Sequence, residues 1–213
     1  MKSYCIKEGY QSDPVAVYGG GIFQSKHYQV LVYEFAAQLI EKEGLSNILD
    51  IGCGFAKKLD KYINPVCNDI TGIDLFPGIA YCKKTHIFGE WFVDNVENSK
   101  VALGRKFDVI LASDIVEHLD DPDKLFEYIR KYSTQETYVI ISTPERDVTR
   151  GSDSFGPPSN CCHVREWNTE EFKAYAGSQG LLIQEAHLVK DRLRTSNKKC
   201  CQLFLMTWRK DEL

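Results

Sequence analysis

Four side chains in two short segments have the types and spacing needed to bind a cation or move a proton. Asp114, Glu117 and His118 follow the spacing i, i+3 and i+4, so one helical turn would place them on the same side. His163 lies in the segment Cys161-Cys162-His163-Val164-Arg165-Glu166-Trp167. Two carboxylates and two imidazoles together could hold a divalent ion. Two other interpretations remain open: His118 acts as a general base without a metal, or these residues are structural.

A second group of residues has the pattern of a nucleotide-binding turn. The pattern predicts a buried strand followed directly by a glycine turn in Asn47-Ile48-Leu49-Asp50-Ile51-Gly52-Cys53-Gly54-Phe55. Gly52 and Gly54 would let a ligand approach the backbone closely, beside the N-terminus of the helix expected next. Asp74 ends the following apolar run, where a carboxylate commonly binds both ribose hydroxyls. A dinucleotide site would need glycine where Lys57 stands.

Short apolar runs alternate with helical patterns between these groups. The predicted strands are Asn47–Ile51, Asp69–Asp74, Trp91–Asp94, Phe107–Ala112 and Thr137–Ser142. The predicted helices are Lys26–Glu43, Ala56–Ile63, Gly78–Lys83 and Asp123–Tyr132. This alternation favours an α/β fold with a parallel sheet, right-handed crossovers and helices on both faces. The carboxyl ends of its strands would bring both groups of residues to one edge.

The C-terminal part has a different pattern. A helix is expected at Thr169–Ser178, followed by strands at Leu181–Val189 and Cys200–Trp208. A charged turn around Arg192–Lys199 would join these two strands into an antiparallel hairpin. With 213 residues and no linker-like segment, the chain is expected to form a single domain.

The glycine turn and the strand-end acids resemble those of class I S-adenosylmethionine-dependent methyltransferases, whose first motif is D-x-G-x-G. The resemblance extends from about Leu45 to the end of the chain. It implies a Rossmann-like, mostly parallel seven-stranded sheet with a C-terminal antiparallel hairpin. It also implies that the methionine half of S-adenosylmethionine lies against Asp50, Gly52, Cys53, Gly54 and Ser113. Asp74 would bind the ribose, and the adenine would lie beside Leu75, Asp94 and Asn95.

The segment from Asp114 to His118 is similar to the E-x-x-E-H motif of the small-RNA 2′-O-methyltransferases. Ubiquinone-pathway O-methyltransferases have a similar E-H pair. The stretch Ser142-Thr143-Pro144 and the position of His163 before Arg165-Glu166-Trp167 extend the similarity. The resemblance implies a divalent metal ion bound by Asp114, Glu117, His118 and His163. Asp114 replaces glutamate, so its shorter side chain would hold the ion through water.

These features predict an enzyme that O-methylates a hydroxyl of a small polar metabolite, phosphorylated or sugar-like. The anionic group is inferred from three arginines in the loop 143–168: Arg146, Arg150 and Arg165. A solvated loop is the alternative for these arginines. Residues 1–44 would form an N-terminal lid segment and helix, and residues 45–213 the cofactor-binding core. N-methylation of a small molecule is the second hypothesis, and a non-catalytic cofactor-binding partner subunit is the third.

Composition bears on partners and location. A formal net charge of −4 disfavours a nucleic-acid substrate, and no apolar run is long enough to span a bilayer. With no signal-peptide pattern the chain is expected to be cytoplasmic, so we interpret the retention-type ending Lys210-Asp211-Glu212-Leu213 as coincidence. The eight cysteines form no C-x-x-C pair and are expected to be free thiols.

Overall fold

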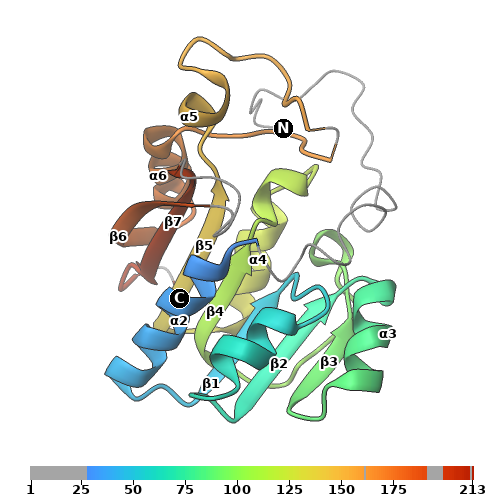
Figure 1. Cartoon of the computed structure of the whole chain (residues 1–213). Helices are drawn as coiled ribbons and strands as arrows, with labels where there is room; N and C mark the ends of the chain where they lie inside the picture. Colours follow the sequence, from blue (N-terminus) through green and yellow to red (C-terminus); the bar gives the residue numbers. More distant parts are fainter. Residues whose placement is uncertain (1–27, 161, 191–198, 212) are drawn as a thin grey trace.

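The computed structural model describes residues 28–160, 162–190, 199–211 and 213. A seven-stranded sheet forms its centre, with the strand order β3-β2-β1-β4-β5-β7-β6 (Figure 1). Strands β1 to β5 run parallel to their neighbours, whereas β7 is antiparallel to both β5 and β6. The bounds are β1 Asn47–Ile51, β2 Asp69–Asp74, β3 Gly89–Val93, β4 Phe107–Ser113, β5 Ser133–Pro144, β6 Leu181–Lys190 and β7 Lys199–Trp208. The predicted sheet and its antiparallel C-terminal hairpin are confirmed.

Alternate residues of the central strands pack into two separate apolar clusters, one on each face of the sheet. In β1, Ile48 belongs to one cluster and Leu49 to the other. Both side chains are fully buried, as expected for a parallel strand that is covered on both sides. The sheet is therefore rigid at its centre, and its strand ends hold the loops that follow them in fixed positions.

Helices cover both faces (Figure 1). One face carries α2 (Val30–Glu43), the π-helical turn η1 (Leu59–Ile63) and α3 (Phe76–Thr85). The other carries α4 (Asp123–Tyr132) and α6 (Thr169–Ser178). A reciprocal capping box between Asn168 and Glu171 begins α6. The short elements η2 (Val96–Asn98), η3 (Val116–His118) and α5 (Arg146–Arg150) follow strands β3, β4 and β5.

Some predicted features differ from the structure or lie outside its described part. The helix expected at 56–63 is an irregular π-helical turn, and α5 in the loop 143–168 was not predicted. The part of the N-terminal lid segment before residue 28 and most of the turn at 192–199 lie outside the described residues. Six described cysteines are free thiols: Cys53, Cys67, Cys82, Cys162, Cys200 and Cys201. Within the described residues, every helix is too short or too polar to cross a membrane.

Candidate functional site

The glycine loop after β1 is held to the end of β2 by backbone and carboxylate contacts. Gly52 and Gly54 have φ angles of 77° and 58°, a region that favours glycine. The amide of Gly54 donates to Oδ2 of Asp74 at 2.6 Å, and the amide of Leu75 donates to Oδ1 at 2.6 Å. The Asp74 carboxylate thus fixes the loop. It lies at the end of β2, at the position where the sequence predicts a ribose-binding carboxylate.

Asp50 is a fully buried carboxylate beneath this loop. The hydroxyl of Tyr33 in α2 donates to its Oδ2 at 2.9 Å, whereas Oδ1 has no hydrogen-bond partner among the described residues. Burial raises the pKa of Asp50 to about 7. An unsatisfied buried carboxylate oxygen is costly, which indicates a position where a ligand donor belongs.

The other predicted cofactor residues lie at neighbouring strand ends. Asp94 follows β3 and accepts hydrogen bonds from the Ser99 hydroxyl at 2.7 Å and the Lys100 amide at 3.1 Å. The side chain of Asn95 caps η2. Ser113 ends β4, and its hydroxyl lies 2.9 Å from that of Ser142 in β5. The fold therefore places the predicted cofactor residues along one edge of the sheet, as the topology requires.

A cluster of three potential metal ligands lies beyond β4. One ligand atom from each of Glu117, His118 and His163 falls within 4.8 Å of the others. The two imidazole rings meet edge to face, with centroids 4.8 Å apart. His118 Nδ1 lies 2.7 Å from the carbonyl oxygen of Cys162, and His163 Nδ1 lies 2.6 Å from Glu166 Oε1. Both Nδ1 atoms are therefore suited to donate a proton, which leaves both Nε2 atoms as acceptors.

The pKa values in this cluster are shifted mainly by burial. Burial and, to a smaller extent, the nearby His163 together lower the pKa of His118 to about 4. His118 is therefore neutral at physiological pH. Burial also raises the pKa of Glu117 well above its ordinary value. Glu117 Oε2 accepts from the Thr143 hydroxyl at 2.9 Å, whereas Oε1 is buried and unpaired among the described residues.

Asp114 departs from the predicted arrangement. The helical turn begins only at Val116, and Asp114 itself has a left-handed backbone with φ 54°. Its carboxylate accepts hydrogen bonds from Gln29 Nε2 and from the Ser142 hydroxyl. Asp114 is therefore not among the three residues whose ligand atoms lie within 4.8 Å of one another. It still lies near them: burial raises the pKa of Asp114 and the charge of His163 opposes that shift.

The three loop arginines are engaged within the protein. Arg146 is buried and pairs with Asp147 at 3.0 Å and with Glu171 at 2.6 Å. Arg150 pairs with Glu166 at 2.9 Å. Arg165 is buried and donates to the carbonyl of Asp120 at 2.8 Å. These contacts stabilise the loop, so the arginines give no support to a phosphorylated acceptor.

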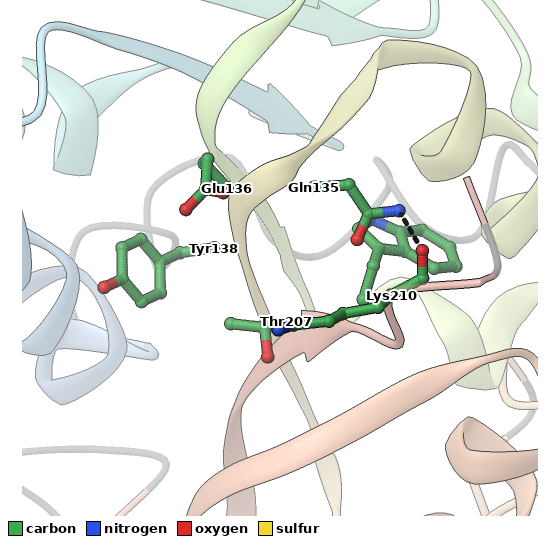
Figure 2. Close-up of a pocket in the computed structure, with 6 residues that line it drawn as sticks. Gln135, Glu136, Tyr138, Thr207 and Lys210 are labelled. Carbon is green, nitrogen blue, oxygen red and sulfur yellow. Dashed lines mark hydrogen bonds between the residues drawn. The ribbon is translucent and has the colours of Figure 1, made fainter.

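A separate cavity of about 510 Å³ lies at the opposite edge of the sheet, beside the start of β5 and the end of β7 (Figure 2). Gln135 Nε2 donates to the carbonyl of Lys210 across it at 3.1 Å. Its lining residues are Gln135, Glu136, Tyr138, Thr207, Trp208 and Lys210. None of these belongs to the predicted site, because ligands of open α/β sheets bind at the carboxyl ends of the parallel strands.

Comparisons with known proteins agree with this arrangement. A family model described as a methyltransferase domain matches residues 25–197. A search of curated proteins finds no match. A solved S-adenosylmethionine-dependent methyltransferase from Clostridium acetobutylicum is 13% identical with a TM-score of 0.66, covering 91% of this chain and 97% of that one.

Two further solved structures share the fold. The N-methyltransferase NodS from Bradyrhizobium japonicum, solved with S-adenosyl-L-homocysteine, is 18% identical with a TM-score of 0.62, covering 94% of each chain. The small RNA methyltransferase HEN1 is 19% identical with a TM-score of 0.64, covering 85% of this chain and 25% of that one. At these identities the likeness concerns the fold.

The chain belongs to the methyltransferase-domain family, since the family model spans most of its length. It is a class I S-adenosylmethionine-dependent methyltransferase, with S-adenosylmethionine as methyl donor. The predicted class and fold are thereby confirmed. The methyl acceptor, the metal and the individual site residues stay predictions.

Proposed function

We propose that this methyltransferase transfers a methyl group to a hydroxyl oxygen of a small polar metabolite, beside a divalent cation held by Glu117, His118 and His163. The clustering of these three side chains carries the proposal. The cofactor would bind along the adjoining strand ends, at the predicted positions Asp50, Gly52, Cys53, Gly54, Asp74, Leu75, Asp94, Asn95 and Ser113. The net charge of −4 favours a small molecule over a nucleic acid as acceptor.

The donor set suits a divalent ion. Glu117 contributes an unpaired buried oxygen, and each histidine has its Nδ1 beside a carbonyl or a carboxylate. Such outer contacts commonly orient metal-binding histidines and fix their tautomer. Asn160 Nδ2 lies 2.9 Å from His163 Nε2, so this amide would turn aside when an ion binds. Mixed oxygen and imidazole ligands suit manganese, iron, cobalt, nickel or zinc.

The chemistry required of the chain is alignment and removal of one proton. The acceptor oxygen attacks the methyl carbon in line with the carbon–sulfur bond, and sulfur keeps the bonding electron pair as a neutral thioether. A bound cation would lower the pKa of the acceptor hydroxyl. With a cation bound, Glu117 Oε1 and His118 Nε2 would be ligand atoms, so the hydroxyl proton would leave to solvent. Without a cation, the neutral His118 Nε2 would accept that proton as a general base.

The proposal is tested with methyl-labelled S-adenosylmethionine and a set of hydroxylated and amino metabolites. We expect O-methylated product, loss of activity after chelation with EDTA, and recovery on adding manganese. Full activity in enzyme shown to be metal-free by elemental analysis would overturn the proposed role of the metal. An N-methylated product would overturn the proposal that the acceptor atom is oxygen. Turnover of none of these metabolites, with cofactor still bound, would favour the non-catalytic subunit.

Variants separate the acceptor site from the cofactor site. His118→Ala and His163→Ala should each lose most activity and bound metal, with the affinity for S-adenosylhomocysteine unchanged. His187→Ala is the matched control, because His187 is exposed on β6, where it pairs with Glu185 and lies beside the Phe35 ring, outside the cluster. Loss of cofactor affinity in the two site variants would contradict the assignment.

A further inference from the structure

Lys58 places a cation beside the buried Asp50, although Lys58 belongs to none of the motifs described above. Lys58 directly precedes η1, on the helical segment that follows the glycine loop. Its Nζ lies 4.8 Å from the centre of the Tyr33 ring. The hydroxyl of the same tyrosine donates to Asp50 Oδ2. One buried side chain therefore contacts both the cation and the anion.

Neither charge is fully satisfied within the described part of the chain. No described carboxylate forms an ion pair with Lys58, and Asp50 Oδ1 has no hydrogen-bond partner there. Burial lowers the pKa of Lys58, while the charges of Asp50 and Asp114 oppose that shift. A half-buried ammonium without a close anion carries a desolvation cost that a ligand carboxylate would offset.

We propose that Lys58 Nζ binds the α-carboxylate of S-adenosylmethionine, beside Asp50, whose Oδ1 would accept from the α-ammonium at the position expected for the methionine half. This inference rests on the family's cofactor and deepens the proposed site. An amino acid carries both charges on one carbon, so a neighbouring cation and anion recognise it as a pair. Tyr33 holds the two protein groups in place, by its hydroxyl on one side and its ring face on the other.

Other nearby cations are committed elsewhere. Lys57 lies over the rings of Phe55 and Tyr81, at 5.8 Å and 5.9 Å from their centres. The three loop arginines are paired with carboxylates or carbonyls. Lys58 differs from these residues because its charge acts on Asp50, and it lowers the pKa of that carboxyl against the larger, raising effect of burial.

The test compares three ligands by calorimetry: S-adenosylhomocysteine, its decarboxylated analogue, and 5′-methylthioadenosine, which lacks the whole amino-acid end. Lys58→Met should lower the affinity for S-adenosylhomocysteine about 10- to 100-fold and change the affinity for the other two ligands by no more than about twofold. Asp50→Asn should weaken the first two ligands and spare the third. The wild-type protein should itself prefer S-adenosylhomocysteine over the decarboxylated analogue by a similar factor.

Controls distinguish this assignment from a structural role. Lys61→Met alters an exposed lysine whose Nζ bonds the Tyr62 hydroxyl, and it should affect no ligand. Lys58→Arg should keep the preference for the carboxylate, and Lys58→Gln serves if the methionine variant unfolds. Equal weakening of all three ligands, or unchanged binding of S-adenosylhomocysteine, would overturn the inference. If the wild-type protein binds none of them, the cofactor assignment itself fails.

Discussion

Ile115 leaves no space for a side chain at Gly52: a Cβ atom on residue 52 would lie 2.0 Å from Ile115 Cδ1. Gly52 follows β1, and Ile115 lies in the loop after β4, directly before η3. The contact therefore packs the glycine loop against the segment that carries Glu117 and His118. A shift of the glycine loop would therefore displace the segment after β4, and the reverse, because closely packed side chains transmit strain.

Gly52→Ala should lower the free energy of unfolding by about 2–5 kcal/mol, through left-handed backbone strain and steric overlap. Chemical denaturation measures this change. Gly104→Ala is the matched control, because Gly104 has φ 68° but open space around it. This variant should lower the free energy of unfolding by only about 1–2 kcal/mol. Adding Ile115→Ala to Gly52→Ala should recover part of the loss. Equal effects at the two glycines would show that the Ile115 contact is unimportant.

Asp74→Ala should weaken S-adenosylhomocysteine by about 1.5–3 kcal/mol in calorimetry, because charge-assisted hydrogen bonds to the ribose would be lost. Asp74 also accepts from the Gly54 and Leu75 amides, so the loop itself should loosen. Asp153→Asn, at an exposed position in the loop after α5, is the control. Unchanged affinity in Asp74→Ala would remove this residue from the cofactor site.

Asp50 should make stability depend on pH. Its pKa is raised from 3.8 to about 7 by burial and the charge of Asp74, against the lowering effects of Tyr33 and Lys58. A carboxyl with a raised folded-state pKa contributes stability that is fully present below its unfolded pKa and is lost as pH rises toward 7. Asp50→Asn should therefore gain stability relative to wild type between pH 4 and pH 7, by at most roughly 4 kcal/mol. A difference that stays constant over this range, measured by urea unfolding, would contradict the shift.

Glu166→Gln should weaken manganese binding about 10- to 100-fold, because the carboxylate beside His163 Nδ1 orients the ring and raises its basicity. Competition with a chelator of known affinity measures the change. Asn160→Ala is the comparison variant: it removes the amide beside His163 Nε2 and should not lower the affinity for manganese. If Glu166→Gln binds manganese as tightly as wild type does, the charge of Glu166 does not contribute to metal binding by His163.

Hydrophobic periodicity was sufficient to predict most of the sheet, because strands buried on both faces leave continuous apolar runs. Helices α4 and α6 begin and end at the predicted residues. The segment before η1 was harder to predict. Ala56 there has a left-handed backbone with φ 51°, which a regular helix pattern does not include.

The site was less predictable where it depends on contacts between distant segments. Asp114 has helical spacing to Glu117 and His118, yet Gln29 and Ser142 hold its carboxylate outside their cluster. Lys58 looks like a solvated helix charge until Tyr33 is found beside it. In each case the deciding partner lies far away in sequence, where local pattern carries no information.

Strand β7 lies between β5 and β6, and β6 joins the sheet through β7. During synthesis, β5 and β6 therefore both leave the ribosome before the strand that connects them exists. Until β7 emerges, β5 has one unpaired side and β6 has no partner strand, and unpaired strands promote association between chains. The sheet can close only after residues 199–208 have been made, so translation that stalls shortly before them would release an aggregation-prone chain.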